Sequence, residues 1–298
     1  MPSRSIPLPR PLDLVLTCAV HRHGPHDPTI RVGPRELWRA TRTPEGIGTI
    51  HITTADARAR AEAWGPGAGW LLDNAPSFLG SHDDDEGFEG RDAPLRELHR
   101  RLTGMWIGRT DAVMEALVPA IIEQKVTSAE AHRSWAFMTR FWGEVAPGPL
   151  RLRVPVASQR LAREPYWAYH RFGIERKRAD TIRRAAAVAP RMEEIVALPL
   201  DRAYARLRTI QGVGAWTAAE VAVRALGDVD AVPVGDFHLP HLVSWALAGE
   251  PRGSDERMLE LLEPYRGHRA RAIRLLESGV RRPPRRAPRY AARSIATY

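Results

Sequence analysis

A glycine-rich turn followed by a lone carboxylate is the part of the sequence best suited to chemistry. Gly212 and Gly214 interrupt a helical apolar pattern that resumes at Trp216, and Asp236 follows after a loop. Glycines let backbone come close to a ligand, and a turn that opens a helix presents unpaired N–H groups to an anion such as a DNA phosphate. A tight helix–helix turn without a ligand is the alternative interpretation.

Asp236 also has two interpretations. It precedes an apolar helical run with Pro240 in its first turn, which is typical of a helix N-cap. Taken alone, Asp236 is better explained as an N-cap, and a functional role is the alternative interpretation. The glycine turn shortly before it in the sequence favours the functional interpretation, and the two are compatible.

Length and composition narrow the class of protein. A chain of 298 residues suits two domains. We expect a cytoplasmic, nucleoid-associated protein without membrane contact, because no apolar run approaches about 18 residues and no signal pattern begins the chain. Cys18, the only cysteine, excludes an internal disulfide and a cysteine-held zinc or iron–sulfur site within one chain.

The net charge of +9 invites a nucleic-acid partner, but much of it lies at the end of the chain. Residues 281–298 contain six arginines and no acid, and we expect a basic disordered tail there. The body of the chain is therefore only mildly basic, and charge alone does not establish DNA binding.

Residues 1–82 are expected to form a mixed α/β domain. Four short β-branched runs between Gly and Pro predict strands of a small antiparallel sheet, and Ala55–Trp64, rich in Ala, Arg and Glu, predicts a helix. The predicted strands are Leu12–Thr17, Thr29–Val32, Leu37–Thr41 and Ile47–Thr53.

An acidic, glycine-containing run, Ser81–Asp92, is expected to be a solvated linker, and we place the linker itself at 83–94. The consecutive carboxylates Asp83, Asp84 and Asp85 do not have the spacing of a calcium loop. From residue 95 to 280 the apolar pattern is helical, so the fold class is α+β with an all-α second domain of two lobes.

The sequence resembles the helix-hairpin-helix DNA glycosylases, and the glycine turn carries that resemblance. The specific motifs are GVGAWTA and then ALGDVDAVPVGD, which ends at Asp236. A tryptophan directly after the hairpin, here Trp216, is similar to the 3-methyladenine DNA glycosylase II branch. Further similarities, such as IIEQKVTSAEA and PYRGHRARAI, extend the resemblance from Leu12 to Gly279.

The resemblance implies excision of a damaged, alkylated base from duplex DNA in base excision repair. The nucleotide would be flipped out of the stack, and Asp236 would stabilise the cationic sugar and orient or activate water. Trp216 would stack on the base. Because members that also nick the strand carry a lysine at this position, we expect a monofunctional enzyme without lyase activity.

The resemblance also implies further site residues and partners. We expect a monomer that acts on damaged double-stranded DNA and requires no cofactor. The expected base-pocket residues are Trp216, Glu220, Tyr265 and Arg274. The expected DNA contacts are Gly212, Val213, Gly214, Gln124, Lys125 and His238. Backbone carbonyls of Arg208, Ile210 and Val213 are expected to hold a Na⁺ or K⁺ ion.

Several alternatives stay open at this stage. Glu220 and Arg274 stand where the family commonly has aromatic residues, and they would either form an ion pair or make the pocket more polar. Lys125 stands at the family's base-stack wedge and could instead hold phosphate. A core position for Trp216, a solvent-facing His238, a non-catalytic lesion- or structure-specific DNA-binding protein and a purely structural adaptor are the remaining alternatives.

Overall fold

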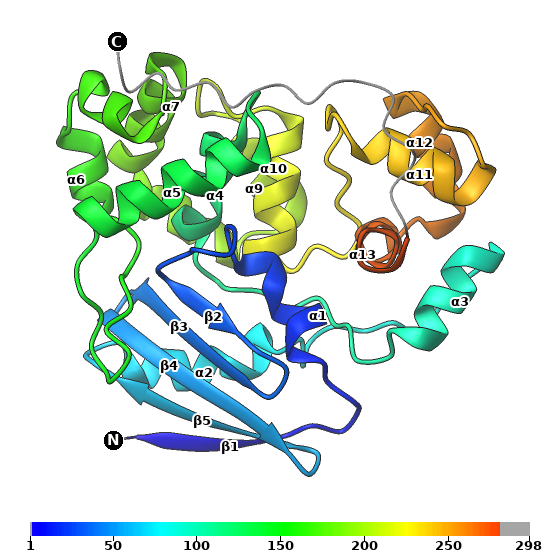
Figure 1. The fold of residues 1–298 in the computed structure, drawn as a ribbon, viewed down its shortest axis with the longest axis horizontal. Coiled ribbons are helices and arrows are strands. Elements are labelled where there is room, and N and C mark those ends of the chain that lie inside the picture. The colour runs from blue at the N-terminus through cyan, green and yellow to red at the C-terminus, as the bar shows by residue number, and fades with distance from the viewer. Residues whose placement is uncertain (1, 281–298) are drawn as a thin grey trace.

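The computed structural model describes residues 2–280, so the predicted basic tail (281–298) lies outside the described residues. An antiparallel sheet in order β1-β5-β4-β3-β2 occupies one side of the molecule, and helices fill the remainder (Figure 1). The expected α+β class is confirmed. The strands are β1 Ser3–Pro7, β2 Ile30–Val32, β3 Glu36–Thr43, β4 Gly46–Ala55 and β5 Arg58–Trp64.

The predicted helix Ala55–Trp64 is wrong, because this segment contains strand β5. Its alanines, Ala59, Ala61 and Ala63, are fully buried and alternate with charged residues, which is the period of a strand with one buried face. Asp56 and Ala57 have φ angles of 48° and 57° and make the hairpin to β4. Pairing along β4 thus outweighs the helix propensity of this composition.

The predicted strand Leu12–Thr17 is also wrong. The chain instead forms a short helix, α1 (Leu14–Cys18), because the Asp13 carboxylate accepts hydrogen bonds from the N–H groups of Val15 and Leu16. The other three predicted strands correspond to β2, β3 and β4. Helix α2 (Ala68–Phe78) packs on one face of the sheet through Leu71, Ala75 and Phe78.

The helical part contains two apolar cores. Its helices are α3 Ala93–Arg101, α4 Val113–Glu123, α5 Ser128–Trp142, α6 Ser158–Arg163, α7 Arg176–Ala187, α8 Ala189–Glu193, α9 Leu200–Leu207, α10 Ala215–Val221, α11 Leu239–Ala248, α12 Asp255–Leu262 and α13 Arg269–Gly279. The larger core lies among α4, α5, α7, α9 and α10, and the smaller core lies among α3, α11, α12 and α13. A π-helical turn, Ala222–Leu226, continues α10.

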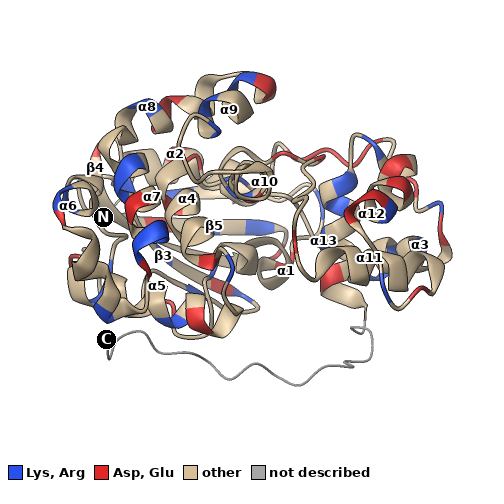
Figure 2. Cartoon of the chain, turned by 90° about the horizontal axis from the view of Figure 1, so that it is seen from above, with Lys and Arg blue, Asp and Glu red and all other residues tan. Residues whose placement is uncertain are grey.

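Acidic and basic positions are interspersed over the helical part and do not separate into halves of one sign (Figure 2). No helix within residues 2–280 has the length and apolar character needed to cross a bilayer.

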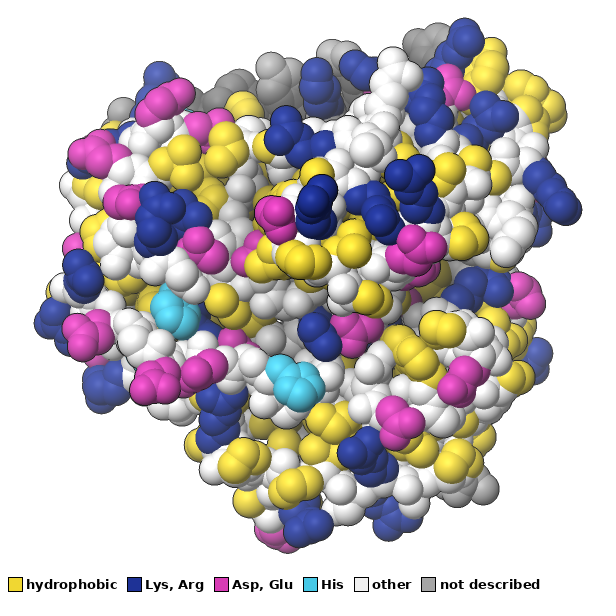
Figure 3. All heavy atoms as spheres, turned by 180° about the vertical axis from the view of Figure 1, so that it is seen from behind, with side chains coloured by type: hydrophobic (Ala, Val, Ile, Leu, Met, Phe, Trp, Pro, Cys, Tyr) yellow, Lys and Arg dark blue, Asp and Glu magenta, His cyan; other side chains and the backbone are white. Residues whose placement is uncertain are grey.

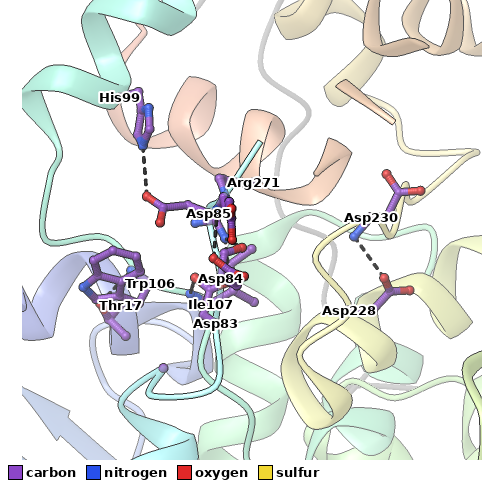
Figure 4. Close-up of polar contacts among 12 residues, drawn as sticks. Thr17, Asp83, Asp84, Asp85, His99, Trp106, Ile107, Asp228, Asp230 and Arg271 are labelled. Atoms are coloured by element: carbon purple, nitrogen blue, oxygen red, sulfur yellow. Dashed lines mark hydrogen bonds and ion pairs between the residues drawn. The ribbon is translucent and has the colours of Figure 1, made fainter. Parts of the chain in front are cut away.

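Most residues of the acidic segment are exposed, but Asp83 and Phe88 are buried within it. One carboxylate oxygen of Asp83 accepts a hydrogen bond from Arg271 of α13 at 2.5 Å, and the other accepts one from the Ile107 N–H at 2.8 Å (Figure 4). Arg271 also donates to the Asp84 carbonyl. The side chains of Asp83 and Arg271 are 0% and 2% exposed, so this is a fully desolvated ion pair.

We expect Asp83→Ala to lower the free energy of unfolding by about 3–5 kcal/mol, because it leaves the Arg271 guanidinium buried without its counter-charge. Chemical denaturation measures this change. Asp84→Ala removes a neighbouring exposed carboxylate and serves as the control, with a much smaller expected loss. Similar losses for the two variants would contradict the structural role of Asp83.

Candidate active site

The glycine turn joins α9 to α10, as the sequence predicts. Gly212 has a φ of 103°, a conformation that L side chains rarely adopt, and a Cβ atom there would collide with the Thr181 side chain. Gly214, in contrast, has an ordinary φ and no neighbouring atom where a Cβ would lie. Within the described chain nothing demands glycine at position 214, which leaves its backbone open to close approach from outside.

Gln124 supports this turn from the end of α4. Its side-chain amide donates to the Gly212 carbonyl at 2.9 Å and to the Thr217 hydroxyl at 2.8 Å. Gln124 therefore supports the hairpin from within the protein. Its predicted contact with DNA stays a prediction. Lys125, the next residue, is exposed and has a φ of 56°.

Asp236 is held by three donors. Its Oδ1 atom accepts from the backbone N–H groups of His238 at 2.7 Å and Leu239 at 2.8 Å, at the beginning of α11. Its Oδ2 atom accepts from the indole Nε1–H of Trp216 at 3.0 Å. The carboxylate is half-buried, so it caps the start of α11 and still has access to solvent.

The indole of Trp216 is fixed by this bond and by its place on α10. The side chain is half-buried rather than part of an apolar core, and it joins the hairpin to the aspartate loop. The structure thus brings together the predicted residues Gly212, Gly214, Trp216 and Asp236. Their roles toward a base or a phosphate stay predictions.

The loop that carries Asp236 is tied to the start of α13. Asp230 forms an ion pair with Arg269 at 2.5 Å and accepts from the Gly267 N–H at 2.8 Å. The Ala270 N–H donates to the Val229 carbonyl at 2.9 Å. These contacts fix α13 relative to the Asp236 loop.

Glu220 forms an ion pair with Arg224, four residues later, and not with Arg274. The ion pair between Glu220 and Arg274, one of the two alternatives, is not formed, because Arg274 is buried against the N-terminal part of the chain. Its guanidinium donates to the Leu16 carbonyl of α1 at 2.6 Å. Glu220 shares one face of α10 with Trp216 by its i, i+4 spacing.

Tyr265 is not available to a pocket. It is 3% exposed, its hydroxyl donates to the Asp92 carboxylate at 2.6 Å, and it packs in the smaller helical core near Phe88. Burial raises the pKa of its hydroxyl to about 12, and the bond to Asp92 adds to this rise. Tyr265 is therefore a structural residue, which corrects its expected place in the base pocket.

Glu277 is a residue of this site that the sequence did not reveal. The pKa of its carboxyl is raised to about 6, because desolvation and the charges of Glu220 and Asp236 together outweigh the opposing charges of Arg274 and Arg224. Its side chain is exposed. The only signal in the sequence was its i, i+3 spacing from Arg274.

An aromatic-ring contact lies next to Asp236 in the sequence. His238 is exposed, in agreement with the solvent-facing alternative, and its ring lies edge-on to Phe237 at 4.9 Å between centroids. Phe237 is 78% exposed, the largest value among the exposed large apolar side chains of the described residues. Phe237 was not predicted as a site residue, although its position directly after a candidate catalytic carboxylate could have indicated one.

We expect Glu277→Gln to raise the free energy of unfolding at pH 7 and to leave it unchanged at pH 4. The raised pKa means that the folded protein binds more protons than the unfolded chain between about pH 4.5 and 6. Stability linked to this carboxyl is therefore present below that window and is lost as the pH rises through it.

Chemical denaturation of both proteins at the two pH values measures this difference. The exposed Glu89 supplies the control Glu89→Gln. Identical stabilities of the wild type and Glu277→Gln at pH 7 would show that the site does not destabilise the charged carboxylate.

Sequence comparison finds relatives over part of the chain. No protein-family model matches it. The probable bifunctional transcriptional activator/DNA repair enzyme AlkA of Mycobacterium tuberculosis is 29% identical over 157 residues. This match covers 50% of the chain and 30% of the curated relative, so the chain spans less than a third of that relative's length.

Solved structures match nearly the whole chain. A 3-methyladenine DNA-glycosylase from Archaeoglobus fulgidus has a TM-score of 0.79 at 21% identity and covers 92% of this chain and 97% of its own. An 8-oxoguanine glycosylase/lyase from Clostridium acetobutylicum, solved with double-stranded DNA, has a TM-score of 0.69 at 13% identity, with coverages of 90% and 91%. The chain therefore has the helix-hairpin-helix DNA glycosylase fold, and the predicted resemblance is confirmed at the level of the fold.

Proposed function

We propose that this chain is a DNA glycosylase that flips a damaged base out of duplex DNA and hydrolyses its N-glycosidic bond. The observation that carries the proposal is the geometry of Asp236, a half-buried carboxylate held on both oxygens beside a glycine hairpin. The fold of the solved relatives and the partial sequence similarity to a DNA repair enzyme support it.

Asp236 supplies a fixed negative charge. Breakage of an N-glycosidic bond develops positive charge on the sugar, as in other glycoside hydrolyses. Three hydrogen bonds hold the carboxylate in one orientation before the substrate arrives, so little reorganisation is needed as that charge develops. Neighbouring lone pairs of Asp236 orient the attacking water, and Trp216 offers its ring for stacking on the base.

We infer that duplex DNA is bound on the side of the hairpin. The exposed N–H groups near Gly214 and the exposed Lys125 suit phosphates of one strand. Exposed arginines adjoin the hairpin, and the Arg184 guanidinium donates to the Gln211 carbonyl at 3.4 Å. Figure 3 shows Lys and Arg side chains gathered in the upper half of the rear face, the side on which Figure 2 places α8 and α9.

A monovalent cation at the hairpin carbonyls fits part of this geometry. The Ile210 carbonyl already accepts the Val213 N–H at 2.9 Å, and its second lone pair is open to an ion. The carbonyls of Arg208 and Val213 would complete the set. Such an ion would bring positive charge to the phosphate-binding turn. No group of three or more metal-binding side chains occurs in the described part of the chain.

We expect Asp236→Asn to lower the rate of base release by about 100-fold or more, because it removes the charge opposite the cationic sugar. Base release from methylated duplex DNA under single-turnover conditions measures this loss. Binding to an abasic-site analogue should change little, since Asn keeps an acceptor for the start of α11. Asp201→Asn, an exposed carboxylate of α9, is the control.

If the wild type binds the analogue but releases no base from any lesion, the chain is a lesion-binding protein rather than an enzyme. If the wild type neither binds nor releases, the proposal of DNA repair fails altogether.

Trp216 leads us to propose that the enzyme leaves an intact abasic site. An indole cannot form the Schiff base on which strand nicking by a lysine nucleophile depends. We expect no covalent trapping to substrate DNA by borohydride, measured on a denaturing gel. Covalent trapping of the wild type would reveal an amine nucleophile elsewhere in the chain and would contradict this proposal.

A further inference from the structure

We propose that an aromatic patch with an arginine, formed by α5 and the 3₁₀ helix Tyr166–Phe172, is a docking surface for an acidic peptide segment of another protein. The aromatic patch consists of Phe137, Phe141, Trp167 and Arg171. This inference goes beyond the proposed glycosylase function and does not depend on it.

Helix α5 carries apolar side chains on two of its faces. Its buried face includes Trp135, Met138 and Trp142, which belong to the larger helical core. Phe137 and Phe141, four residues apart, project from another face and are 43% and 49% exposed. A helix that packs against one core needs a single apolar face, so the second face is free to contact a partner.

Trp167 is the most exposed apolar side chain of the patch. It is 63% exposed, and within residues 2–280 no ring contact, cation–π contact or hydrogen bond involves its side chain. Tyr169 and Phe172 of the same 3₁₀ helix are buried in the larger helical core. Contacts within the described part of the chain therefore do not account for a tryptophan at this position, whereas tryptophan is typical of the anchors of protein–protein interfaces.

Arg171 joins the two elements of the patch. Its guanidinium carbon lies 3.8 Å from the centroid of the Phe141 ring. The rings of Phe137 and Phe141 both pack on the buried ring of Phe172, at 5.3 Å and 5.9 Å between centroids. These contacts hold the exposed rings in place before a partner arrives, which lowers the entropy cost of binding.

The patch is positively charged. Within the described residues the Arg171 guanidinium donates no hydrogen bond and forms no ion pair, so its N–H groups are open to a carboxylate. Arg133, four residues before Phe137 on α5, is exposed and has no ion pair in the same part of the chain. Glu144 and Glu175, the exposed acids that follow the patch residues in sequence, are already in ion pairs with other arginines.

This charge decides among the possible occupants. Residues 281–298 contain six arginines and no acid, so repulsion between like charges opposes docking of that segment. A second copy of the patch would likewise bring arginines together. A nucleobase stacks on an open ring face, but Arg171 already covers one face of Phe141. An acidic peptide fits both features, because its carboxylates pair with Arg171 while its apolar side chains pack against Phe137 and Trp167.

The patch is separate from the candidate active site. Gln124, which supports the glycine hairpin, lies just before the first residue of α5, Ser128. Phe141 lies near the other end of this helix, about 20 Å from Ser128 at the rise of an α-helix. A docked peptide therefore leaves the hairpin accessible, so that the chain can hold a partner and DNA together.

Fluorescence anisotropy with a short fluorescein-labelled peptide, rich in Asp and Glu with Leu and Phe between them, tests this docking surface. Two comparison peptides carry Asn and Gln, or Lys, in place of the acids. We expect the full chain to bind the acidic peptide at low salt and to lose affinity for it as the salt concentration rises. The neutral peptide should bind at least about tenfold more weakly, and the lysine peptide should not bind.

Two variants assign the binding to the patch. Trp167→Ala and Arg171→Glu should each weaken binding of the acidic peptide by about tenfold. Trp167→Ala removes no printed side-chain bond of the fold, so its thermal unfolding and its base release should match those of the wild type. Arg252→Glu is the matched control for Arg171→Glu, because Arg252 is exposed between α11 and α12, on the other side of the helical part (Figure 1).

Failure of the wild type to bind the acidic peptide, or equal binding of the neutral peptide, would overturn the proposal. So would an equal loss of binding in Arg252→Glu, because overall charge would then explain the effect. Displacement of the peptide by duplex DNA, together with weaker DNA binding by Trp167→Ala, would assign the patch to nucleic acid instead. Each of these results leaves the proposed function untouched, because none of them measures base release by the wild type.

Discussion

The position of α13 depends on the buried ion pair between Asp83 and Arg271, and the arrangement of the candidate site depends on α13. One carboxylate oxygen of Asp83 accepts a hydrogen bond from Arg271, and the other accepts one from the backbone N–H of Ile107. A single carboxylate therefore joins α13 to the segment that contains Ile107. An isolated charge at this depth would be strongly unfavourable, which makes the two residues mutually dependent. The contact is geometrically specific in a way that apolar packing is not.

Three of the four charged residues of helix α13 have different surroundings. Arg271 is paired inside the protein, Arg274 is bonded to a backbone carbonyl of α1, and Glu277 reaches the surface near the aspartate loop. Arg269, at the start of the same helix, anchors that loop through Asp230. One helix thus connects the N-terminal unit with the Asp236 loop.

The parts of this structure that the sequence predicted are those determined by local rules. Gly212 is required by a positive φ, and Asp236 caps the following helix while facing Trp216; both follow from residue type and spacing. The strand β5 was missed because burial of alternating alanines against β4 decides its conformation, and composition does not record that pairing. Asp83 was predicted to be solvated because its neighbours in the sequence are acidic residues and glycines.

The same distinction applies to the site. Tyr265 and Arg274 were expected in the pocket by resemblance alone, and tertiary packing directs both of them into the protein. Glu277 was not predicted for the converse reason, because its raised pKa depends in part on charged groups on α10 and on the Asp236 loop that are distant in the sequence. When charged groups come together only in the folded protein, their effects on one another's pKa values cannot be derived from the sequence alone.

Lys125 has a consequence for the balance between stability and function. A lysine in a left-handed backbone conformation is strained, by an amount on the order of 1 kcal/mol, and glycine would adopt the same φ without that strain. The residue lies at the end of α4 beside the hairpin brace, Gln124, where a long positive side chain projects into solvent. The fold therefore carries a locally unfavourable backbone at the residue whose charged amine is exposed beside the hairpin.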